Sequence, residues 1–173
     1  MRFTTFGFLV FFLVVYIVYW ALRGRSRLTF LALASSLFYA AWSIPFFLHF
    51  ASIVFLNFAF VKLLQKRRSG GILAVILTID FANLFFFKYF YFLLEILSDA
   101  TGWSGLTSAQ FNSALNESVG LSSILLPLAI SFYTFQIVAY VVDVYRGRIE
   151  RQDSLLEFYV FILFFPQLVA GPI

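Results

Sequence analysis

The sequence predicts an all-α protein that spans a membrane, with about five full helical spans followed by a broken or re-entrant sixth segment. Of its 173 residues, 62% are apolar and only 12% are charged. Soluble globular proteins are typically about 45–50% apolar and about 25% charged. Eight acidic and twelve basic residues cannot cover a soluble protein of 19.9 kDa with a mean hydropathy of +0.96. We therefore expect lipid to be the main solvent of this chain.

Six apolar segments follow one another along the chain. A helix needs about 20 apolar residues to cross ~30 Å of hydrocarbon. The predicted segments are residues 3–22, 28–44, 45–64, 71–97, 121–144 and 155–170. The second is slightly short and ends at Pro45. Together they predict that residues 1–173 form part of a single transmembrane domain.

The sixth segment differs from the other five because only eleven residues, Leu155–Phe165, precede Pro166. Gly171 and Pro172 then interrupt the helix again. Lipid cannot hydrogen-bond a freed backbone group, so a break at membrane depth requires protein or water around it. We expect a bent or re-entrant element beside a site, with a simple proline-kinked helix as the alternative.

The basic residues predict the orientation of the spans. Cytoplasmic loops of membrane proteins carry an excess of Lys and Arg. With the N-terminus outside, the cytoplasmic turns are 23–27, 62–68 and 146–151, and they hold ten of the twelve basic residues. The exterior loop 98–120 then contains Asp99 and Glu117 but no Lys or Arg. These features predict a multi-pass protein of a bacterial inner membrane, with its N-terminus outside.

The composition also excludes several kinds of site. The chain has no cysteine and one histidine, His49, so we expect no disulfide, no thiolate nucleophile and no metal site. The basic residues form short clusters between apolar runs and not one polar face, which argues against nucleic-acid binding. His49 lies near the outer end of its span, where a lone histidine is more typical of an interfacial polar residue than of a catalyst.

Three polar residues of the fourth span fall inside the apolar run. Asp80 lies roughly 15 Å into it, near the bilayer centre, and Asn83 follows at i+3 on nearly the same face. This pair is either part of a hydrated path or a helix–helix hydrogen bond. Lys88 lies close enough to the outer interface to extend its amine there, so we expect it to anchor the helix.

The fifth span carries the densest polar pattern of the chain. Tyr133, Gln136, Tyr140 and Asp143 follow at spacings of three or four and form one stripe. Ser131 lies nearby on another face. Asp143 and Arg146 are i, i+3 neighbours at the predicted cytoplasmic end of the span, and we expect them to pair. Such a stripe faces protein or water and not lipid. It fits the wall of a transporter as well as the cavity of an enzyme.

Two segments resemble a known family. Residues 124–136, with Tyr140 and Asp143-Val144-Tyr145-Arg146-Gly147, resemble the opening signature of the membrane-bound O-acyltransferases (MBOAT). Residues 164–173, which include Pro166, Gln167, Gly171 and Pro172, resemble their Phe-Phe-Pro-Gln-Leu-x-Ala-Gly-Pro-Ile segment. Residues 37–42 and 86–90 resemble the bacterial alginate O-acetylation branch. Ala129 departs from the family, which often has glycine there.

The resemblance implies an enzyme that moves an acyl group, acetyl in this branch, to hydroxyls of an exported polysaccharide such as alginate. The donor would be an acyl thioester on the cytoplasmic side, such as acetyl-CoA or an acyl carrier protein, with no covalently bound cofactor. Periplasmic acetylation proteins would be further partners. The catalytic histidine of the family lies beyond residue 173 in its pattern, and His49 does not match that motif. The chain is therefore expected to be an N-terminal portion that is inactive alone.

Acyl transfer needs a route that admits donor and acceptor from opposite faces of the membrane, and we expect the polar stripe and the broken segment to form the wall of this route. The candidates are Ser131, Tyr133, Gln136, Tyr140, Asp143, Arg146, Pro166, Gln167, Gly171 and Pro172. Two other functions remain compatible with the residues alone. One is a transporter or export subunit, although its internal repeats are not evident. The other is a non-catalytic membrane subunit of a polysaccharide-modifying complex.

Overall fold

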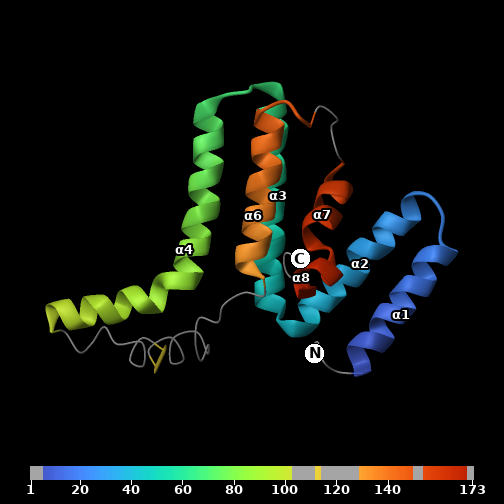
Figure 1. Cartoon of the computed structure of the whole chain (residues 1–173), viewed down its shortest axis with the longest axis horizontal. Helices are drawn as coiled ribbons and strands as arrows, with labels where there is room; N and C mark the ends of the chain where they lie inside the picture. The colour runs from blue at the N-terminus through green and yellow to red at the C-terminus, as the bar shows by residue number, and fades with distance from the viewer. Residues whose placement is uncertain (1–5, 103–111, 114–128, 150–153, 171–173) are drawn as a thin grey trace.

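The computed structural model describes residues 6–102, 112–113, 129–149 and 154–170. Its helices are α1 Phe6–Ala21, α2 Arg25–Trp42, α3 Ile44–Lys66, α4 Gly70–Thr101, α6 Ile130–Tyr145, α7 Leu155–Leu163 and α8 Phe165–Ala170 (Figure 1). The described elements are all helical, which agrees with the predicted all-α class. Residues 121–128 of the fifth predicted span, together with Gly171 and Pro172, lie outside the described residues.

Two of the helices are long and apolar enough to cross a bilayer. They are α3 with 23 residues and α4 with 32 residues, or about 35 Å and about 48 Å of helix. The helices α1 and α6 have 16 residues each and are apolar but shorter. That the chain has five full spans and a broken sixth segment therefore stays a prediction.

Single residues set the first two helix boundaries. Gly24 turns the chain between α1 and α2 at φ 60°, and Arg27 Nε donates to the Leu22 carbonyl at 2.8 Å. Ser43 separates α2 from α3, because its N–H donates to the Tyr39 carbonyl at 3.2 Å. Pro45 follows in the first turn of α3, where a missing N–H costs nothing. The predicted boundary at Pro45 is thus confirmed to within one residue.

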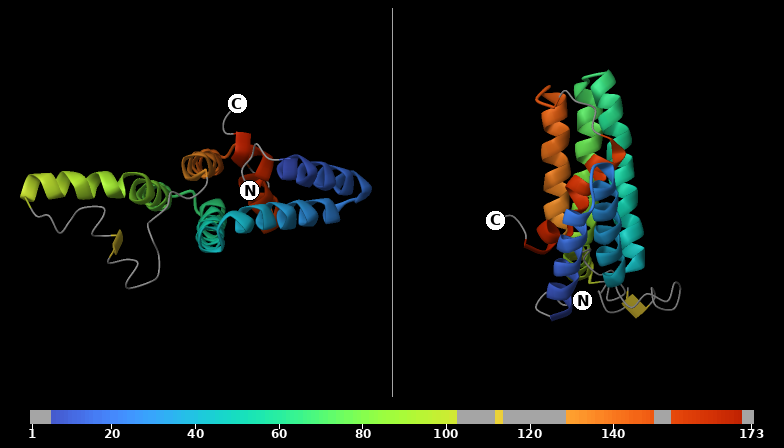
Figure 2. Two further views of the ribbon diagram at one scale, coloured as in Figure 1. Left: turned by 90° about the horizontal axis from the view of Figure 1, so that it is seen from below. Right: turned by 90° about the vertical axis from the view of Figure 1, so that its right-hand side faces the viewer.

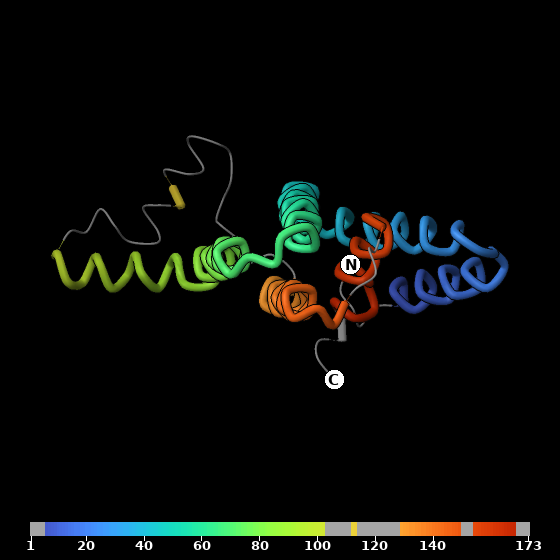
Figure 3. Tube along the Cα trace, turned by 90° about the horizontal axis from the view of Figure 1, so that it is seen from above, coloured from blue at the N-terminus to red at the C-terminus, as the bar shows by residue number. Residues whose placement is uncertain are grey.

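The helices form an elongated row in which α3 is central. The helices α2, α4, α6 and α7 all contact α3. Seen from above, α4 lies at one end of the row and the hairpin of α1 and α2 lies at the other (Figure 3). The C-terminal part of α4 bends away from the bundle (Figures 1 and 2), and there the Tyr91 hydroxyl donates to Asn112 Oδ1 at 2.8 Å.

Two clusters of buried side chains hold this row together. The larger cluster joins α3, α4, α6 and α7 and includes Phe50, Ile76, Ile137 and Phe158. The smaller one joins α1 and α2 to Phe165 of α8. Large apolar side chains also cover the outside of the helices, with Leu37 67% and Ile17 65% exposed. An apolar exterior of this extent is typical of helices that face lipid.

Candidate functional site

The sixth segment is broken at Phe164, two residues before Pro166. Helix α7 ends at Leu163, Phe164 has an extended backbone with ψ 104°, and α8 begins at Phe165. Proline has no N–H, and its ring would clash with the carbonyl of Ile162, four residues earlier. The helix therefore cannot continue unbent through this position. With nine residues, α7 is only about 14 Å long, too short to cross a bilayer.

Side chains from other helices bind two of the backbone groups that the break frees. In an unbroken helix the Phe165 N–H would donate to the Phe161 carbonyl. Instead, Gln136 Nε2 of α6 donates to the Phe161 carbonyl at 2.7 Å. The Phe165 N–H donates to Ser35 Oγ of α2 at 3.4 Å. Two freed backbone groups of the broken segment thus have protein partners, as the bilayer argument requires of a break at membrane depth.

The Phe165 ring fixes the start of α8 against α1 and α2. It is 1% exposed, and its centroid lies 5.2 Å from the ring of Phe11 and 5.5 Å from that of Phe38. Edge-to-face contacts at such distances are favourable beyond the burial of area. The broken segment therefore rests on the hairpin of α1 and α2, far from it in sequence.

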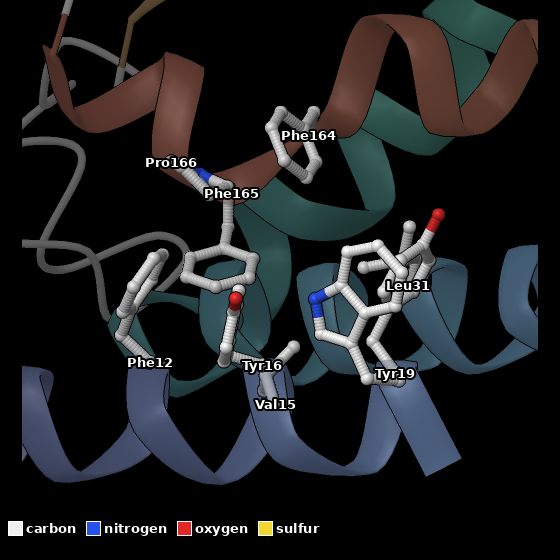
Figure 4. A pocket seen from close by; sticks show the side chains of 9 residues that line it. Phe12, Val15, Tyr16, Tyr19, Leu31, Phe164, Phe165 and Pro166 are labelled. Carbon is white, nitrogen blue, oxygen red and sulfur yellow. The ribbon is translucent and has the colours of Figure 1, made fainter. Parts of the chain in front are cut away.

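An apolar groove of about 290 Å³ opens beside the break (Figure 4). Phe164, Phe165 and Pro166 form one wall, and side chains of α1 together with Leu31 form the other. Figure 4 shows Phe12 and Tyr16 of α1 on either side of the Phe165 ring. Gln167 lies on the exposed side of α8. Pro166 is thus the only predicted tunnel residue among those that line this groove.

The polar stripe of α6 is packed against neighbouring helices. Tyr133 is fully buried, with its ring 4.8 Å from Phe50 of α3. The ring of Tyr140 lies 5.0 Å from Phe158 of α7. Ser131 is half-buried at the start of the helix. The stripe thus faces protein, one of the two predicted environments, and its role as a tunnel wall stays a prediction.

The predicted pairing of Asp143 with Arg146 is wrong, because the ion pair of Asp143 is with Arg148 at 3.1 Å. Helix α6 ends at Tyr145, and Gly147 turns the chain back at φ 73°. The Gly147 N–H donates to the Val144 carbonyl at 3.1 Å, and the Arg148 N–H to the Asp143 carbonyl at 2.9 Å. This is a Schellman motif, and it places Arg148 beside Asp143.

The polar residues of α4 have separate environments. Asp80 is 1% exposed, and Asn57 Nδ2 of α3 donates to Asp80 Oδ1 at 2.8 Å. A helix–helix hydrogen bond was one of the two predicted roles of this position. Asn83 lies one turn further and approaches His49 and Tyr133. Lys88 is exposed, with its amine 5.4 Å from the centre of the Tyr89 ring.

Sequence reasoning missed two residues that the structure makes important. Asn57 is the partner of Asp80, and Ser35 is the partner of the Phe165 N–H. Asn57 carries a detectable signal, because it is an uncharged polar residue in the middle of an apolar span. Ser35 carries little signal, since serine is common in membrane helices. Among the described residues, no three His, Asp or Glu side chains form a group that could hold a metal ion.

Comparisons with known proteins relate the whole chain to bacterial O-acetylases. It is 33% identical to the protein named "Probable alginate O-acetylase AlgI" of Pseudomonas aeruginosa, over 100% of this chain and 32% of that protein. It is also 33% identical to the protein of that name from Pseudomonas putida, over 100% of this chain and 35% of that protein. The "Peptidoglycan O-acetyltransferase" of Helicobacter pylori is 31% identical over 83% of this chain and 30% of its own length.

The chain spans about a third of the length of these curated relatives. No protein-family model matches it, and no solved structure gives a significant match. The similarity to the three relatives nevertheless confirms the resemblance that the two C-terminal motifs predict. The chain is related over its whole length to the AlgI-like branch of the membrane-bound O-acyltransferases.

Proposed function

We propose that the complete protein carrying this chain is a membrane-embedded O-acetyltransferase that acts on hydroxyls of an exported polysaccharide. The observation that carries the proposal is similarity along the whole chain to proteins named alginate O-acetylase and peptidoglycan O-acetyltransferase. Both names point to a carbohydrate polymer that lies outside the cytoplasm. A sugar hydroxyl is therefore the acceptor class.

The chain lies in the inner membrane with its N-terminus outside. The length of α3 and α4 and the apolar exterior of the bundle support the membrane location. The basic turn between α3 and α4 meets the end of α6, because the guanidinium of Arg68 lies directly over Gly147. Two of the three predicted cytoplasmic turns thus lie at the same end of the bundle, which supports the orientation.

The reaction joins a cytoplasmic acyl thioester to an exterior hydroxyl. The hydroxyl oxygen attacks the thioester carbonyl, the carbon–sulfur bond breaks, and the hydroxyl proton ends on the thiol. This step needs a base to take the proton and donors for the developing oxyanion. In this family those groups are expected beyond the present chain. Periplasmic acetylation proteins would take part on the exterior side.

In this reaction, residues of this chain form a wall of the passage that connects the acyl donor with the acceptor. Its support is the broken segment, whose carbonyl at Phe161 is held by Gln136 and whose N–H at Phe165 is held by Ser35. Such side-chain clamps keep a non-helical backbone stable inside lipid. A fixed break leaves the bilayer locally thin, which shortens the distance between the two substrates.

The test is acetyl transfer by the complete protein in a bacterial strain that lacks its own polysaccharide O-acetylase. We expect acetyl esters on the exported polymer with the wild-type protein. Gln136→Leu removes the donor to Phe161 while keeping the volume, so it should lower ester formation at equal protein level. Phe135→Leu is the matched control, because Phe135 is the adjacent residue and is 57% exposed.

The two parts of the proposal fail separately. A wild-type protein that is well expressed but forms no acetyl ester on any exported polymer contradicts the enzymatic function. Gln136→Leu and Asp143→Ala variants that transfer acetyl groups at the wild-type rate contradict only the wall assignment. In that case the proposed enzymatic function would remain, and the polar residues of α6 would only pack against neighbouring helices.

A further inference from the structure

A file of buried and half-buried polar side chains lies where α3, α4 and α6 meet, away from the break. We define this polar file as His49, Asn57, Asp80, Asn83 and Tyr133. Asn57 and Asp80 are each 1% exposed and Tyr133 is fully buried. The residues are consecutive neighbours, because Asn57 bonds to Asp80, and Asn83 approaches both Tyr133 and His49.

Each member of the polar file has a buried atom that completes no hydrogen bond of good geometry with the described residues, even where Asn83 lies close to His49 and Tyr133. These atoms are His49 Nε2, Asn57 Oδ1, Asp80 Oδ2, Asn83 Nδ2 and the Tyr133 hydroxyl. More than about 90% of buried polar groups in native proteins have a partner, because leaving one unpaired is costly. Several such atoms at one three-helix junction therefore indicate a shared partner that is not part of the described chain.

The kinds of unpaired atom identify that partner. Asn57 Oδ1 can only accept hydrogen bonds, whereas Asn83 Nδ2 can only donate. The Tyr133 hydroxyl can do both. A metal cation would satisfy the acceptors alone, and an anion would satisfy the donors alone. Water donates and accepts at once, and a buried water typically makes about three hydrogen bonds to groups of this kind.

We propose that bound water molecules occupy the polar file and connect Asp80 to His49. Asn57 lies eight positions after His49 in α3, or about 12 Å along the helix axis. The aromatic rings of Phe50 and Phe87 border it, since they pack on Tyr133 and His49 at centroid distances of 4.8 Å and 4.9 Å. The junction of α3, α4 and α6 is thus a hydrated site inside an apolar bundle. This inference does not depend on the proposed acetyl transfer.

Radiolytic hydroxyl-radical labelling of the complete protein in lipid nanodiscs tests the proposal, because radicals form from bound water and attack adjacent side chains. We expect Tyr133 to be modified severalfold faster than Tyr140, although Tyr133 is the more buried of the two. Tyr140 is the matched internal control: it is the same residue type on the same helix, two turns away, and it packs on Phe158. Equal rates, or a slower rate at Tyr133, would overturn the proposal without any variant.

A variant tests whether the polar file itself holds the water. Asn83→Leu keeps the branched shape of the side chain and removes the amide, so labelling of Tyr133 should fall severalfold towards the rate of Tyr140. Thr78→Val is the control, since Thr78 lies on the exposed side of α4 and its change should leave the rate at Tyr133 unaltered. Unchanged labelling of Tyr133 in a folded Asn83→Leu protein would also overturn the proposal.

Discussion

The carboxylate of Asp80 and the amide of Asn57 illustrate how a single polar contact decides the packing of two membrane helices. A buried carboxylate in an apolar interior is costly unless it is hydrogen-bonded. Here Asn57 Nδ2 lies 2.8 Å from Asp80 Oδ1, and both residues are 1% exposed. The contact therefore fixes the register of α3 against α4, because a shift by one residue would leave the carboxylate in hydrocarbon.

Asn57→Leu should destabilise the complete protein by about 1–3 kcal/mol, because it removes one partner and leaves Asp80 with an unsatisfied oxygen. The double variant Asn57→Leu, Asp80→Leu should lose less unfolding free energy than the single variant, since no carboxylate then remains buried. The measurement is the unfolding free energy in mixed detergent micelles. A double variant that is less stable than the single variant would contradict this account of the pair.

Gly147 is required by the turn that ends α6. Its φ is 73°, a region that costs other residues roughly 1–2 kcal/mol. An added Cβ would also lie 2.6 Å from Arg68 Nη1, although that flexible side chain can move.

We expect Gly147→Ala to lower the thermal midpoint of unfolding through the backbone cost. Gly7→Ala is the control: Gly7 lies in α1 with nothing near its missing Cβ, so alanine there should stabilise the helix by about 0.5–1 kcal/mol. The two changes should therefore shift the midpoint in opposite directions. A shift of the same sign and size would show that the turn does not constrain Gly147.

At the scale of the element, the pair α7 and α8 is a helix interrupted at one point and held at both ends. Helix α7 begins with a capping box in which Ser154 and Glu157 bind each other's backbone N–H, and the Tyr159 hydroxyl lies 2.7 Å from Ser36 Oγ of α2. Helix α8 is held by the Phe165 ring in its aromatic cluster. Because lipid gives little driving force for helices to associate, these specific contacts hold the short pieces in place.

Phe165→Ala should therefore destabilise the protein much more than Phe161→Ala. Phe165 is 1% exposed and its truncation leaves a cavity, whereas Phe161 is 47% exposed. The loss at Phe165 should stay below the roughly 3–5 kcal/mol typical of cores of soluble proteins, because its ring is transferred to lipid and not to water. Thermal unfolding in detergent measures both variants, and equal losses would contradict the anchoring role of Phe165.

At the scale of the whole molecule, the elongated row of helices exposes apolar side chains along its length. The basic residues lie at the turns: Arg23, Arg25 and Arg27 around the first turn and Lys66, Arg67 and Arg68 around the second. A row of helices with an apolar exterior and charged turns is suited to lipid on its sides and to water at its ends.

Reporter fusions test this arrangement. Green fluorescent protein fused after Ser69 should fluoresce, because the proposed orientation puts the turn between α3 and α4 in the cytoplasm. Alkaline phosphatase fused after Gly102, at the end of α4, should be active in the periplasm. The exchanged fusions are the controls and should be silent. Activity of alkaline phosphatase after Ser69 would reverse the proposed orientation.

The apolar helices, a boundary near Pro45, a break near Pro166 and the place of Asp80 inside an apolar span could all be predicted from the sequence. These properties depend on hydropathy, on the missing proline N–H and on the solvation of charge. Each of them can be judged from residues that lie close together in the sequence. The tertiary structure alone decided the partners. Ser35 binds the Phe165 N–H across 130 residues, and Asn57 binds Asp80, because helical periodicity defines a face but not the helix that covers it. It also paired Asp143 with Arg148, because the backbone reverses at Gly147 instead of continuing the helix.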